Sequence, residues 1–175
     1  MELLAKYADH HLPQAGAERR VESAKRNGPK LAPQLARESL GHGDDAKFAA
    51  LRDRLETTIL ATVEAAGVNG AGAPRVPTTT NLHFDFIEGE ALVIALDLKG
   101  LAVSTGAACS SGALEPSHVL SAMGLAPERA RASLRFSLGK QNTADDVDYA
   151  LSILPETVAR LRELSPVYHK AATSF

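Results

Sequence analysis

The chain's one cysteine lies in a segment of small residues that could carry reactive chemistry. The ten residues from Ser104 to Ala113, with Cys109 among them, are all Ser, Thr, Gly, Ala or Cys. No large side chain would anchor this segment in a core, so its composition favours an accessible, mobile loop. A thiol there could act as a nucleophile once ionised, because the thiolate attacks and a free cysteine has a pKa of about 8.5. The alternative is a small buried hydrophobic residue, and composition alone leaves the two interpretations about equally supported.

A second candidate for chemistry is Arg135, at a strand end in the segment Ser133–Leu138, which reads as a strand. A guanidinium can hold a carboxylate through two parallel hydrogen bonds, so Arg135 is a candidate for substrate binding. A structural or surface ion pair is the alternative.

The six histidines do not suggest a metal site. His10 and His11 are adjacent and would point to different faces of a helix, and no other pair has the spacing of metal ligands. We interpret His83 as a strand residue and His118 as a surface residue. We expect no bound metal.

The surrounding pattern predicts a small mixed domain. Apolar residues recur at spacings of three and four from Phe48 to Val63, which predicts a helix over 46–66. Further along we expect a loop over 67–77, strands over 81–86, 101–104 and 133–138, helices over 88–98 and 116–123, and a long helix that begins with a capping box at Thr143. This order predicts an α/β fold of the α+β sandwich type, with about three strands and helices mainly on one face.

The first residues differ from the rest in composition. Residues 1–43 contain basic pairs and the turn Asn27-Gly28-Pro29, and they read as an irregular or short helical segment. We therefore expect two parts, 1–43 and a domain over 44–175.

Bulk composition narrows the class of protein. The net charge of -2 lacks the basic excess of a nucleic-acid binder. No apolar run approaches the ~20 residues that span a membrane, a lone cysteine forms no internal disulfide, and the first residues do not read as a signal peptide. We expect a cytoplasmic protein with no nucleic-acid or membrane partner.

Several ordered motifs give the sequence a family resemblance. They are Thr80-Asn81-Leu82-His83-Phe84, Glu88-Gly89-Glu90-Ala91-Leu92, the stretch from Ser104 to Gly112, Leu114-Glu115-Pro116-Ser117-His118, Leu134-Arg135-Phe136-Ser137-Leu138-Gly139 and Leu161-Arg162-Glu163-Leu164-Ser165-Pro166. With the helix over 46–66 they cover about 130 residues. Together they resemble the C-terminal small domain of cysteine desulfurases of the iron-sulfur-cluster type, which are class V aminotransferase-like enzymes of pyridoxal phosphate fold type I.

The resemblance implies a function for both candidates. In that family L-cysteine becomes L-alanine while its sulfur passes to an enzyme cysteine as a persulfide, for iron-sulfur cluster assembly or another delivery. The resemblance gives the sulfur-accepting role to Cys109 and substrate-carboxylate binding to Arg135. It implies a sulfur-acceptor protein or a complementary large domain as partner, and an uncovered sheet face would also suit a homodimer.

The cofactor machinery of that family has no counterpart in the sequence. The seven lysines are Lys6, Lys25, Lys30, Lys47, Lys99, Lys140 and Lys170, and none has the Ser-x-His-Lys context that the family uses. We therefore expect a sulfurtransferase fragment, as from a truncated or frameshifted gene, that binds no pyridoxal phosphate and has no activity by itself. A non-enzymatic sulfur carrier or interaction domain, a nonfunctional remnant, and a selenocysteine lyase or aminotransferase-like parent are the alternatives.

Overall fold

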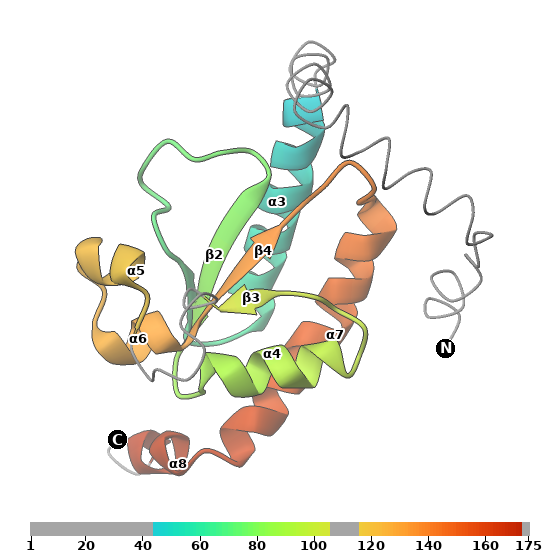
Figure 1. Cartoon of the computed structure of the whole chain (residues 1–175). Coiled ribbons are helices and arrows are strands. Elements are labelled where there is room, and N and C mark those ends of the chain that lie inside the picture. Colours follow the sequence, from blue (N-terminus) through green and yellow to red (C-terminus); the bar gives the residue numbers. More distant parts are fainter. Residues whose placement is uncertain (1–43, 106–115, 173–175) are drawn as a thin grey trace, which may run out of the picture. The chain divides into compact units, whose positions relative to one another are not determined.

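The computed structural model describes residues 44–105 and 116–172 (Figure 1). In chain order the elements are α3 (Asp44–Thr62), β1 (Ala66–Val68), β2 (Thr79–Phe84), α4 (Gly89–Asp97), β3 (Ser104–Thr105), α5 (His118–Ala122), α6 (Pro127–Arg131), β4 (Ser133–Ser137), α7 (Ala144–Glu163) and α8 (Pro166–Ala172).

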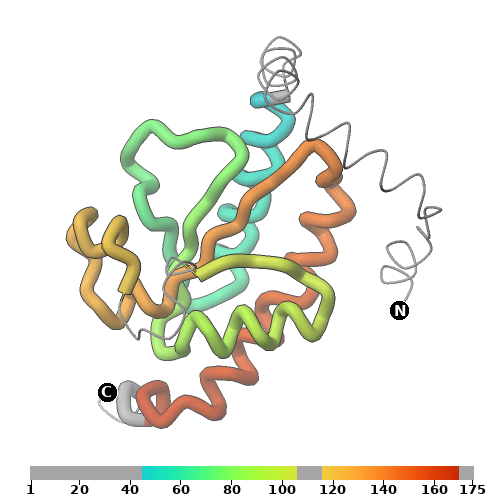
Figure 2. Tube along the Cα trace, viewed as in Figure 1, coloured from blue at the N-terminus to red at the C-terminus, as the bar shows by residue number. Residues whose placement is uncertain are grey.

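The strands form one antiparallel sheet in the order β1-β2-β4-β3. Figure 2 shows the orange β4 running between the green β2 and the yellow-green β3, although both precede it in the sequence. The register places Leu82 opposite Leu134 and Asn81 opposite Arg135. The expected small sheet with helices is confirmed, but it has four strands rather than about three.

One face of this sheet supports the core. Along β2 the residues alternate, so that Thr80, Leu82 and Phe84 are buried while the residues between them are only half-buried. The side chains of Leu82 and Leu134 are fully buried against apolar residues of α3, α4 and α7. In the view of Figure 1, α3 lies behind β2 and β4. The period of two in the strands therefore gives the sheet one apolar face and one polar face.

Two helix ends agree with the sequence analysis. The backbone N–H of Thr143 donates to the Asp146 carboxylate at 2.8 Å, and the Thr143 side chain accepts from the backbone N–H of Asp146, so the expected capping box is present. Gly100, with φ of +80°, follows α4 and ends it in the left-handed conformation that glycine tolerates best.

Several boundaries differ from the prediction. The expected loop over 67–77 begins with β1, which has only three residues, and the expected strand over 101–104 is β3 at Ser104–Thr105. The five-residue helix α6 was not predicted. These elements are too short to show a periodic pattern in sequence. The predicted segment 1–43 lies outside the described residues.

Among the described residues, no helix combines the length and the apolar character needed to cross a membrane.

Candidate functional site

A row of polar side chains crosses the sheet on the face opposite the core. Asn81 of β2 pairs with Arg135 of β4, and Arg135 pairs with Ser104 of β3. Asn69 follows β1 and continues the row, because its backbone N–H donates to the Asn81 carbonyl at 2.9 Å. We call Asn69, Asn81, Arg135 and Ser104 the polar row. It places one side chain from each strand or strand end side by side.

A cavity of about 240 Å³ lies beside the polar row. Asn69, Asn81 and Arg135 line it from the sheet, together with Thr79. Its other wall comes from α5 and the residues at its two ends: Ser117, Val119, Leu120 and Met123. The cavity thus has a polar floor and a largely apolar wall, which suits a small ligand with one charged end.

Arg135 is exposed at this cavity. Within residues 44–105 and 116–172 no carboxylate pairs with it, and its guanidinium makes no hydrogen bond. An ion pair with a described residue therefore does not account for this arginine. The role of Arg135 in carboxylate binding stays a prediction, and its surroundings are compatible with it.

Hydrogen bonds on the same face fix the orientation of Asn69. The Ser133 hydroxyl donates to the Arg129 carbonyl at 2.7 Å, which uses its only hydrogen. The 2.9 Å contact between Ser133 Oγ and Asn69 must therefore be donated by the Asn69 amide. That amide nitrogen also donates to Asn81 Oδ1 at 2.5 Å. The Asn69 side chain is buried, and its orientation follows from this chain of donors.

His83 completes this network. Its Nδ1 lies 2.8 Å from Asn69 Oδ1, so Nδ1 must carry the hydrogen. A Cβ on Gly67 would lie 2.4 Å from the His83 ring, so the glycine makes room for the ring. Burial, followed by the positive charge of Arg129, lowers the pKa of His83, while Asp85 opposes the shift. His83 is therefore a structural hydrogen-bond donor, in line with its interpretation as a strand residue.

Cys109 lies outside the described residues. The chain reaches it directly from β3, whose Ser104 pairs with Arg135. The structure thus describes the strand that leads to the cysteine and leaves the predicted role of Cys109 as a prediction.

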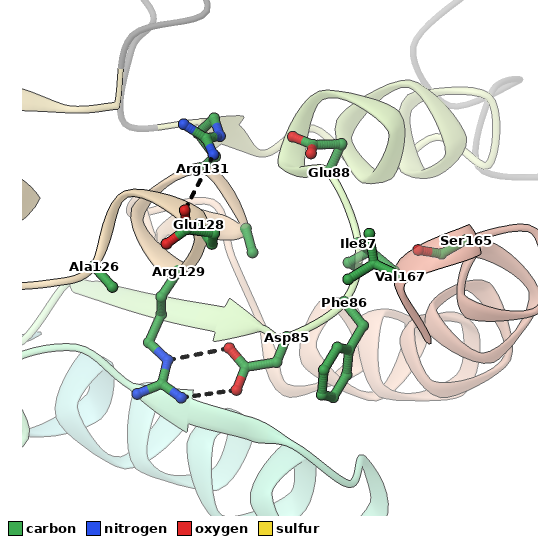
Figure 3. Close-up of a pocket in the computed structure, with 11 residues that line it drawn as sticks. Asp85, Phe86, Ile87, Glu88, Ala126, Glu128, Arg129, Arg131, Ser165 and Val167 are labelled. Carbon is green, nitrogen blue, oxygen red and sulfur yellow. Dashed lines mark hydrogen bonds and ion pairs between the residues drawn. The ribbon is translucent and has the colours of Figure 1, made fainter. Parts of the chain in front are cut away.

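A larger cavity of about 460 Å³ lies elsewhere, between residues 85–88, α6 and the start of α8. Figure 3 shows Arg129 pointing at Asp85, with which it makes two hydrogen bonds of 3.1 and 2.8 Å. Arg131 lies 3.8 Å from Glu128. The charges of these arginines are thus matched by neighbouring carboxylates, whereas Arg135 has no such neighbour among the residues that the structure describes. We take the smaller cavity as the candidate site for this reason.

The described residues do not form a pyridoxal phosphate site by themselves. Such a site needs a lysine to bind the cofactor's aldehyde. The lysines whose side chains are described are Lys47, Lys99 and Lys140, and all three are exposed and line neither cavity. The polar row fits a substrate carboxylate, but the described part of the chain supplies no amine to this site.

Sequence reasoning identified Arg135 but missed Asn69 and Asn81. The alternation in 81–86 already placed Asn81 on the polar face, and pairing with the strand of Arg135 would have brought the two together. No local signal marks Asn69, because its role depends on the pairing of β1 with β2.

Comparisons with known proteins identify the family of the chain. The aminotransferase class-V family model matches residues 38–150, which is more than half of the chain. The chain is 43% identical over 147 residues to a cysteine desulfurase of Gluconacetobacter diazotrophicus, covering 84% of this chain and 36% of the relative. It is 39% identical over 160 residues to the cysteine desulfurase IscS 1 of Archaeoglobus fulgidus, covering 89% of this chain and 41% of that one.

A solved structure of a NifS-like protein has the same fold. It superposes with a TM-score of 0.60 at 29% identity, over 73% of this chain and 31% of the other. The chain thus spans well under half the length of the relatives that it matches. It belongs to the aminotransferase class-V family and is a relative of the cysteine desulfurases.

Proposed function

We propose that this chain is the part of a cysteine desulfurase that binds the substrate carboxylate and accepts the sulfur. Arg135 holds the carboxylate of L-cysteine, and Cys109 receives the sulfur as a persulfide while L-alanine is released. The sulfur then serves iron-sulfur cluster assembly or another acceptor. The relatives named cysteine desulfurase support this reaction.

The observation that carries the proposal is the pairing of Ser104 with Arg135. Four residues after Thr105 comes Cys109, so even an extended chain keeps its Cα within about 14 Å of that of Thr105. The carboxylate-binding arginine and the accepting thiol are therefore tied to adjacent strands. One small substrate could then be held by the first and meet the second.

We further propose that the chain binds no pyridoxal phosphate by itself and works together with a large domain that does. When bound, that cofactor activates the amino acid for cleavage of its carbon-sulfur bond. This chain contributes orientation of the substrate and the thiol that takes the sulfur. The lack of a lysine at the described cavity supports this division of roles.

A chimeric enzyme tests the proposal. Residues 38–172 of this chain replace the matching segment of a full-length relative, and alanine formation from L-cysteine is measured. We expect turnover that Cys109→Ser abolishes and that Arg135→Ala lowers at least tenfold, because a charge-assisted bidentate pair is lost. Cofactor absorbance, retained in both variants, shows that the chimera is folded. Alanine formation that is unchanged in Cys109→Ser would contradict the proposal.

The same variants separate a desulfurase from a simple sulfur carrier. The whole chain is incubated with a complete desulfurase and L-cysteine, and Cys109 is examined by mass spectrometry. A carrier accepts sulfur on Cys109 equally well with Arg135→Ala, because it binds no amino acid. In that case the chimera would also give no alanine that depends on Arg135.

A further inference from the structure

We infer that Asn81 is a second carboxylate-binding residue beside Arg135, and that Asn69 fixes it in the donor orientation. The inference rests on the proposed function, since it concerns the α-carboxylate of the same substrate.

The orientation of the Asn81 amide follows from the hydrogen-bond network. Asn69 donates to Asn81 Oδ1, so the oxygen of the Asn81 amide faces β1. In a planar amide the NH₂ group lies on the other side of Cγ from the oxygen. The NH₂ group of Asn81 is thereby turned away from Asn69, toward the side on which Arg135 lies.

Asn81 and Arg135 are placed to act on one ligand. They are directly opposite on antiparallel strands, where Cβ atoms lie about 4.5–5.5 Å apart. Both line the 240 Å³ cavity. Within the described residues the Asn81 NH₂ group donates to no acceptor, and the Arg135 guanidinium has no partner either. Two sets of donors thus face the same space with no acceptor from the described part of the chain.

The donors of Asn81 and Arg135 favour a carboxylate as the ligand. A carboxylate only accepts hydrogen bonds and can take several at once, so it satisfies both groups. A carboxamide of the same size places donors against donors and brings no charge. The pair therefore favours the carboxylate of a small amino acid over its amide.

Nuclear magnetic resonance of the whole chain tests the inference, with propionate as the probe and propionamide as its uncharged match. We expect propionate to shift the side-chain NH₂ signals of Asn81 and the Nε–H signal of Arg135 with one common dissociation constant. Propionamide should leave both unchanged.

Variants define the contribution of each residue. We expect Asn81→Asp to weaken propionate binding by about tenfold or more, because a donor is replaced by a like charge. Asn69→Ala should weaken binding less, since the Asn81 amide is free to turn. Ser137→Ala, exposed on the same face but outside the polar row, is the matched control and should bind as the unchanged chain does.

Two results would overturn the inference. If Arg135 responds to propionate while the Asn81 signals stay in place, Arg135 binds the carboxylate without Asn81. If neither responds, both assignments are wrong. The wild-type titration decides this even if a variant fails to fold. Propionate binding that is intact while the chimera makes no alanine would contradict the proposed function and leave the role of Asn81 standing.

Discussion

The two faces of the sheet differ in what their side chains do, although the same strands build both. Leu134 and Arg135 are neighbours in β4, yet the first is fully buried against the core and the second is exposed at a cavity. The core face stabilises the fold, whereas three residues of the polar row line a cavity and are proposed to bind a ligand. Stability and recognition can therefore be altered separately by substitutions one residue apart.

The largest effect on stability is expected at the core face. Leu134→Ala should lower the free energy of unfolding by about 2–5 kcal/mol, because it removes buried apolar contacts and leaves a cavity. Urea denaturation followed by circular dichroism measures this change. Arg135→Ala is the matched control and should stay within about 0.5 kcal/mol of the unchanged chain. Equal losses for both would show that the two faces are not energetically distinct.

A smaller effect is expected where the polar face is itself buried. Ser133 is 0% exposed, and its hydroxyl both donates to the Arg129 carbonyl and accepts from the Asn69 amide. Ser133→Ala removes the side-chain donor to the Arg129 carbonyl and one of the two acceptors of the Asn69 amide, which should cost about 1–3 kcal/mol in the same urea measurement. Ser137→Ala, exposed on this face, should cost almost nothing. A neutral Ser133→Ala would mean that the network does not hold the polar row.

The next largest effect on stability is expected at the ion pair between Arg129 and Asp85. The hydrogen bond from Arg129 holds the pKa of Asp85 below its usual range, although burial opposes the shift. Because both groups are partly exposed, Arg129→Gln should cost about 1 kcal/mol or less at neutral pH.

The sign of its pH dependence follows from linkage. A carboxyl with a lowered pKa contributes stability above its unfolded value of about 3.9, and this is lost as pH falls through the folded pKa. The difference between the unchanged chain and Arg129→Gln should therefore shrink in acid. A difference that stays constant down to about pH 2.5 would rule out the Asp85 pair as its source.

The smallest expected effect is a pH dependence from His83. Burial, and then the charge of Arg129, lower its pKa in the folded chain, so the unfolded chain binds its proton more readily. The stability from this group is complete above the unfolded pKa of about 6.5 and is lost as pH falls toward the folded pKa. Between about pH 7.5 and about pH 5.5, the unchanged chain should lose more stability than His83→Gln. Parallel losses in the two proteins would contradict this.

The two faces also show which features a sequence can reveal. The alternation around Leu134 and the spacing from Phe48 to Val63 predict the core face, because burial imposes a period that a single segment displays. Arg135 could be singled out on other grounds, namely the chemistry of its guanidinium and the family motif around it. The position of Asn69 could not, since it depends on the register between β1 and β2 and on a hydroxyl 64 residues away.

The strand order has a consequence for how the protein is made. β4 lies between β2 and β3 and is the last of the four strands to be synthesised. Until Ser133–Ser137 has left the ribosome, only the short pairing of β1 with β2 can form, and the apolar side chains of β2 lack their neighbours. When β4 pairs with β2 and β3 it completes the sheet, and the same pairing places Arg135 opposite Asn81 and Ser104. A nascent chain that stops before Ser133 would therefore lack both the central strand of its sheet and Arg135.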